Sequence, residues 1–242
     1  MTTVAKKSRL LTVIGALALV AFVAAQVSGF VLSPPDRGMG HLQKIMYVHV
    51  PAAWTAFAAF IVVFVASVLY LWRRQEKWDL LAASAAEVGT FMTALTLTLG
   101  SIWGRPTWGV WWVWDARLTL SALLLALLLG YLALRRVPAD AETRGRRSAI
   151  AALLAVVVVP VNHFAVEWWR TLHQGRSLDL TPADDLDGAF LGAMALGFLA
   201  MTLVYAWLTV HRVRVARLEE ARDEHALAAA IDERRREAVG VR

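Results

Sequence analysis

The tryptophans of this chain are concentrated in one short segment. Five of the eleven lie between Trp103 and Asp115, where two glycines and a proline interrupt them and the aspartate ends the run. Tryptophan is common at membrane–water interfaces, because its ring is apolar and its N–H needs a polar partner, so one or two there would need no further explanation. Five so close together favour a surface that holds a flat, aromatic ligand.

His49 belongs to the first of two histidine motifs, which runs from Tyr47 to Trp54 and has a proline two residues after the histidine. Proline suits the first turn of a helix and keeps the residue before it extended. We therefore expect Pro51 to begin a membrane-spanning helix and His49 to lie just outside it. Imidazole is the usual protein ligand of haem iron, which makes His49 a candidate ligand. The alternative is an interfacial histidine whose N–H faces water.

The second histidine motif lies between Pro160 and Gly175. His163 and Glu167 are four residues apart and share a face if the helix continues there, so the carboxylate could fix the tautomer of the ring. His163 is either structural or supports a ligand in this way. His173 lies farther along, before a glycine that suits a helix end, and is the second candidate ligand.

Charged residues flank the tryptophans on both sides. A porphyrin is flat and apolar and carries two acidic propionates, so aromatic faces with arginines nearby would suit it. Arg105 and Arg117 are the candidates for pairing with propionates, and the alternative for each is to anchor a helix end. Asp115 precedes the apolar run that starts at Leu118 and is expected to cap that helix, a role compatible with a place in the site.

The elements that must position these side chains are membrane spans. The 242 residues are 58% hydrophobic, and the apolar residues form runs long enough to cross about 30 Å of hydrocarbon as helices. The runs do not alternate as the strands of a β-barrel would. We therefore predict an all-α integral membrane protein with six transmembrane helices, over Leu10–Leu32, Pro51–Trp72, Leu80–Trp103, Leu118–Leu134, Ala149–Val166 and Ala189–Val210.

The basic residues indicate the orientation. Of the 25 Lys and Arg, 19 lie at the two ends of the chain and in alternate connections, which by the positive-inside rule places both termini in the cytoplasm. The net charge of +6 is then a signal of topology rather than of nucleic-acid binding. The first run is expected to stay as an uncleaved anchor, with a cleaved signal peptide as the alternative. Residues 1–211 form the predicted membrane domain, with an outward tryptophan-rich loop over 103–117, and residues 212–242 form a charged cytoplasmic tail.

Several chemistries are excluded. The chain has no cysteine, so it has no disulfide, no thiolate metal site, no thioether bond to haem and no cysteine nucleophile. It also lacks a phosphate-binding GxxxxGK[ST] loop and is not predicted to hydrolyse ATP. Glu87 is the one acidic residue well inside a span, and the sequence assigns it no role.

Three motifs in this order resemble the CcmC family of haem-handling membrane proteins of cytochrome c maturation. The segment Trp108–Asp115 is similar to the tryptophan-rich "WWD" signature of these proteins, and the segments from His49 to Ala53 and from Val166 to Gly175 are similar to the histidine motifs of the CcmC branch. Six spans also fit CcmC better than the larger CcmF and CcsA branches. The resemblance covers nearly the whole chain except its two ends.

The resemblance implies a haem-binding protein that is not an enzyme and lies in the inner (cytoplasmic) membrane, with its site on the outer face. Haem b would have His49 and His173 as axial ligands, and the platform for haem or chaperone would be formed by Trp108, Trp111, Trp112, Trp114 and Asp115. The haem would pass to the chaperone CcmE, and the other partners would be the transporter subunits CcmA and CcmB and the small subunit CcmD.

Two alternative functions make different demands on the residues of the spans. A cytochrome b-type electron-transfer protein would carry histidine pairs within its spans, one on each of two helices, and the expected spans lack such pairs. A transporter whose tryptophans form only an interfacial belt would contain no haem.

Overall fold

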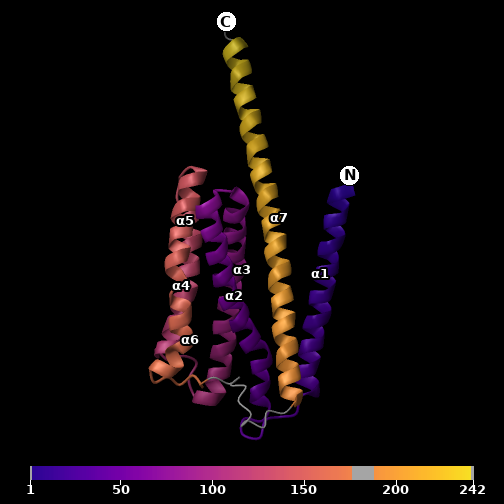
Figure 1. Ribbon diagram of the computed structural model, residues 1–242, viewed down its shortest axis with the longest axis vertical. Coiled ribbons are helices and arrows are strands. Elements are labelled where there is room, and N and C mark those ends of the chain that lie inside the picture. The colour runs from indigo at the N-terminus through magenta and orange to yellow at the C-terminus, as the bar shows by residue number, and fades with distance from the viewer. Residues whose placement is uncertain (1, 176–187, 241–242) are drawn as a thin grey trace.

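The computed structural model describes residues 2–175 and 188–240, and all regular structure in those ranges is helical (Figure 1). Residues 176–187, in the connection between the fifth and sixth expected spans, lie outside the described residues. The elements are α1 (Thr2–Gln26), the π-helical η1 (Val27–Leu32), the 3₁₀ turn η2 (His41–Ile45), α2 (Met46–Arg73), α3 (Glu76–Trp108), α4 (Ala116–Arg136), α5 (Ala141–Ala155), α6 (Val158–Trp168) and α7 (Gly188–Gly240).

The prediction of six membrane spans is confirmed. Within the described residues, six segments are long and apolar enough to cross a membrane, and each contains or overlaps one of the expected runs. They are Leu11–Leu32, His41–Arg73, Glu76–Trp108, Ala116–Arg136, Ala141–Trp168 and Gly188–Arg236.

The helices stand side by side, with α2 and α3 packed against each other at the centre (Figure 1). α1 packs along α7 on one side, and α4, α5 and α6 form the other side. The two chain ends lie at the same end of the bundle, as an even number of spans requires. The opposite end, which we call the loop end, carries η2, the α3–α4 connection Gly109–Asp115 and the segment Trp169–Gly175. The assignment of the chain ends to the cytoplasm remains a prediction.

The expectation that Pro51 begins a helix with His49 outside it is wrong. η2 leads directly into α2 at Met46, so both residues are helical and His49 is buried. Pro51 has no N–H, so the Tyr47 carbonyl four residues earlier lacks its helical hydrogen bond. α7 comes close at this point: a Cβ at Gly197 would lie 3.0 Å from that carbonyl oxygen and 2.9 Å from Cγ of Pro51.

The tryptophan-rich loop is shorter than residues 103–117. α3 continues through Pro106 to Trp108 and ends at Gly109, whose positive φ of 80° and N–H bond to the Arg105 carbonyl form a left-handed helix cap. Only Gly109–Asp115 is non-helical. Trp103 is therefore a buried residue of α3, and Trp108 is fixed at the end of that helix.

The fifth expected span is two helices rather than one. α5 ends at Ala155, α6 starts at Val158, and Pro160 lies in the first turn of α6. Proline has no N–H to donate to the carbonyl four residues back, and that position, Val156, is where the helix breaks. α5 packs against α2 and α4, whereas α6 packs mainly against α4.

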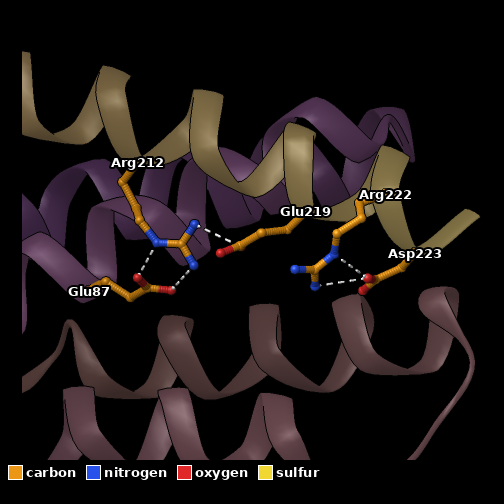
Figure 2. Close-up of polar contacts among 5 residues, drawn as sticks. All are labelled: Glu87, Arg212, Glu219, Arg222 and Asp223. Atoms are coloured by element: carbon orange, nitrogen blue, oxygen red, sulfur yellow. Dashed lines mark hydrogen bonds and ion pairs between the residues drawn. The ribbon is translucent and has the colours of Figure 1, made fainter. Parts of the chain in front are cut away.

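Glu87, which the sequence left without a role, joins two helices. Its carboxylate accepts two hydrogen bonds from Arg212 of α7, one of them Nη2–Oε1 at 3.0 Å, and Nη1 of Arg212 reaches Glu219 at 3.1 Å (Figure 2). α7 continues as one helix across residues 211–212, and the predicted boundary between membrane domain and tail stays a prediction.

Candidate ligand-binding cavity

A cavity of about 540 Å³ opens at the loop end of the bundle. This volume lies within the range of small-molecule and cofactor sites, roughly 300–1,000 Å³. Its walls come from α2, α3, α4, α6, α7, the α3–α4 connection and the segment after α6, and most of the lining side chains are apolar. Of the predicted site residues, those that line it are His49, Trp108, Trp112, Arg117, His163 and His173.

His49 is held rigidly on α2 and is only 8% exposed. Its ring lies over Gly100 of α3, where an added Cβ would come within 3.0 Å of Cε1, and 6.0 Å from the ring of Trp103. The ring nitrogen Nδ1 is buried without a hydrogen-bond partner in the described structure. An unsatisfied buried polar atom costs free energy, so a ligand that engages this imidazole would be favoured here.

His173 reaches the same cavity from the non-helical segment after α6. Its Nδ1 lies 2.9 Å from the Gln174 carbonyl oxygen, and its ring is 6.2 Å from that of Trp108. Because a carbonyl only accepts, Nδ1 carries the proton and Nε2 keeps the lone pair that a metal needs. Burial lowers the pKa of His173, which also favours the neutral, metal-binding form.

Asp115 links the α3–α4 connection to the segment that follows α6. One carboxylate oxygen accepts a hydrogen bond from the Leu118 N–H at 2.9 Å and caps α4, as the sequence predicted. The other oxygen accepts from the Leu172 N–H at 2.8 Å. The aspartate therefore fixes the backbone immediately before His173, although its own side chain does not line the cavity.

The two candidate arginines occupy different positions. Arg117 lines the cavity, donates to the backbone carbonyls of Asn162 and His163 on α6, and lies 5.8 Å from the ring of Phe57. No carboxylate among the described residues forms an ion pair with it. Arg105 is exposed and donates to the Gly109 carbonyl at the end of α3, at 2.7 Å, and its pairing with a propionate stays a prediction.

The tryptophans divide into two groups. Trp103, Trp108 and Trp112 line the cavity. Trp111 and Trp114, by contrast, are 58% and 77% exposed and are not part of its lining. The segment thus supplies both a wall for a ligand and an apolar surface beside the opening.

His163 and Glu167 share α6, as their spacing predicted, because that helix extends to Trp168. Both side chains are exposed, and the ring of His163 lies at the cavity rim, 5.0 Å from that of Phe164.

The sequence reasoning missed Asn162 and Gly100. The side-chain NH₂ of Asn162 donates to Ser121 Oγ at 2.9 Å, and the backbone carbonyl of Asn162 accepts a hydrogen bond from Arg117. A polar residue inside an apolar run was the available signal for Asn162. Nothing in the sequence distinguished Gly100 from the other glycines of the spans.

The donor set limits the chemistry. Among the described lining residues none is acidic, and no group of three or more His, Asp or Glu in the described ranges could hold a bare metal ion. Two imidazoles alone leave a metal under-coordinated. They suit a metal that brings its own planar ring of ligands and needs only axial partners.

Comparisons with known proteins show the family of this chain. The family model "CcmC: Heme exporter protein C" matches residues 2–228. Proteins named Heme exporter protein C are 36% identical over 204 residues in Haemophilus influenzae (84% of this chain and 83% of that protein) and 36% identical over 196 residues in Escherichia coli K12 (81% and 79%). Another, from Bradyrhizobium diazoefficiens, is 37% identical over 199 residues (82% and 76%). The chain, a multi-pass membrane protein, belongs to the CcmC family, heme exporter protein C.

Proposed function

We propose that this protein carries haem for cytochrome c maturation, holding haem b in the loop-end cavity with His49 and His173 as axial ligands. The observation that carries the proposal is the pair of imidazoles in one apolar cavity, one with an unpartnered buried nitrogen and one with its Nδ1 bound to a carbonyl. The family membership supports haem as the cargo.

The other lining residues have matching roles. Trp103, Trp108 and Trp112 provide aromatic walls for a flat ring. Arg117, whose nearest hydrogen-bond acceptors are backbone carbonyls, provides positive charge for a propionate. His163 lies at the rim, where it can support the bound ring without serving as an axial ligand.

In the proposed function the loop end is the outer face of the inner membrane. The exposed Trp111 and Trp114 there provide an apolar docking surface for the chaperone CcmE, next to the opening from which haem leaves. CcmA and CcmB supply the ATP-driven step, and CcmD completes the complex. The protein acts as a carrier and not as a catalyst.

The ligand assignment is tested on protein purified in detergent and loaded with haem. We expect a bis-histidine absorption spectrum in the wild type, and a loss of that spectrum together with weaker haem retention in His49→Ala and His173→Ala. His41→Ala is the matched control, because His41 is exposed at the same end and does not line the cavity. Wild-type spectrum and haem content in both variants would show that the ligands lie elsewhere.

The same preparation separates this function from a cytochrome b-type electron carrier. A carrier gives up its haem when apo-CcmE is added, whereas an electron-transfer protein keeps it. His173 lies outside any helix, so the two imidazoles do not come from two spans as in the electron carriers.

A further inference from the structure

The cavity extends well below the histidines. Phe60 of α2 lines its inner end and lies eleven residues after His49, which at 1.5 Å per residue is about 16 Å along the helix. Leu124 of α4 and Thr93 of α3 line the same inner part. The cavity therefore reaches from the loop end into the depth of the hydrocarbon.

The inner walls offer few free polar groups. Thr93, Thr96 and Ser121 donate their hydroxyl protons to carbonyls of their own helices at 2.8 Å, namely those of Gly89, Met92 and Arg117. The titratable side chains of the lining are His49, Arg117, His163 and His173, and they lie toward the loop end. The cavity is thus apolar inside and positively charged at its mouth, which complements a ligand that has an apolar body and an acidic end.

The cavity also reaches the side of the bundle. α5 packs against α2, but after the break at Val156 the chain continues as α6, which packs against α4 and makes no comparable contact with α2. The cavity occupies the space between α2 and α6. The lining residue Trp54 of α2 is 52% exposed, although it lies inside a membrane span.

The rim of this side opening is formed by two pairs of residues. Trp54 packs edge-to-face on Phe198 of α7, with ring centroids 5.9 Å apart, on the side of α2. Val166 and the exposed His163 of α6 form the opposite side. The surroundings of this opening are lipid chains, because both rim helices belong to membrane spans.

We propose that haem reaches its ligands sideways from the bilayer, through this opening between α2 and α6, rather than from the aqueous phase. The inference rests on the proposed function, since it takes haem as the ligand. Haem has a large apolar ring and partitions into lipid, so this path keeps the ring out of water throughout. The propionates would move toward Arg117 at the mouth while the ring slides between the helices.

The test uses the full-length protein in two haem-donor systems. Val166→Trp places a bulky ring at the α6 rim, and Val166→Ala widens the opening. Leu154→Trp is the matched control, because Leu154 is 71% exposed on α5 and does not line the cavity. Haem uptake is followed by the rise of the bis-histidine spectrum, with haem supplied either from phospholipid vesicles that contain the reconstituted protein or as a haem–albumin complex in water.

We expect Val166→Trp to slow uptake from vesicles several-fold, Val166→Ala to match or exceed the wild-type rate, and Leu154→Trp to be unchanged. The final spectrum and the uptake from albumin should stay as in the wild type. Unchanged vesicle rates in Val166→Trp, or an equal slowing from both donors, would overturn the lateral path. If Val166→Trp fails to fold, a Val166→Ala variant slower than the wild type from vesicles would overturn it as well. Failure of the proposed function looks different, since no bis-histidine spectrum would form in the wild type from either donor.

Discussion

Replacing Asp115 by asparagine should weaken haem binding while leaving the helix cap in place. An asparagine side chain caps a helix about as well as an aspartate, so the bond to the Leu118 N–H survives. Its NH₂ group cannot accept the Leu172 N–H, and the contact that fixes the backbone before His173 is lost. Hydrogen bonds to charged groups are worth about 1.5–3 kcal/mol, and this one is solvent-accessible, so we take a value around the lower limit of that range, about 1–2 kcal/mol.

If that free energy orders His173 for ligation, haem affinity should fall about 5- to 30-fold. The measurement is a haem titration followed by difference absorption, with thermal unfolding by circular dichroism on the same samples. Asp140→Asn is the matched control, because Asp140 caps α5 at the opposite end through the Thr143 N–H at 2.9 Å and lies far from the cavity. Wild-type haem affinity in Asp115→Asn would refute the idea that this carboxylate positions His173.

Three further predictions concern single contacts. Gly100→Ala should reduce haem affinity several-fold in the same titration, since the new Cβ would lie 3.0 Å from Cε1 of His49 and displace the ring. Arg212→Gln should lower the unfolding temperature, because it leaves the Glu87 carboxylate without its partner; both side chains are partly exposed, so the cost is about 1 kcal/mol, or about 2–4 °C. Without haem, the protein should lose stability as the pH falls below about 6.5, because burial lowers the pKa of His173 in the folded state and the unfolded chain then binds the proton more strongly. Thermal unfolding between pH 8 and pH 5 measures this loss, and His173→Gln should reduce it.

Each of these has a matched control or a clear contrary result. Gly130→Ala should leave haem affinity unchanged, since a Cβ at Gly130 meets nothing within 4 Å. Arg222→Gln breaks an exposed pair on the same helix as Arg212 and should not change the unfolding temperature. The ideas fail if Gly100→Ala binds haem normally, if Arg212→Gln and Arg222→Gln unfold alike, or if stability is the same at both ends of the pH range.

The spans could be predicted from the sequence because length and hydropathy decide them almost alone. The cap at Asp115 was also predictable, since an aspartate directly before an apolar run is a local signal. Both features depend on residues that are neighbours in the chain. The residues that line the cavity are far apart in the chain. That they lie together could be inferred only because the two histidine motifs were predicted to lie at the same end of the bundle.

The helix boundaries near prolines were the least predictable feature. Pro51 and Pro106 lie within helices, whereas Pro160 accompanies a break, and the sequence around each gives no clear difference. Packing makes the difference. The Tyr47 carbonyl, which receives no hydrogen bond from Pro51, lies close to Gly197 of α7. Likewise, nothing local separates Trp112, which lines the cavity, from Trp111, which is exposed.

The two proposed ligands differ in how they are held, and this difference suits a carrier. His49 is part of a long helix and packs between Gly100 and Trp103, so moving it would require moving α2. His173 lies on a non-helical segment, where local opening costs far less free energy than unfolding of the bundle. A site with two rigid ligands would bind haem tightly but release it slowly, because affinity is expressed mainly in the dissociation rate. With one rigid and one detachable ligand, haem is held in the cavity until the segment of His173 moves away. The site then opens on the side of His173, next to the exposed tryptophans where the chaperone would dock.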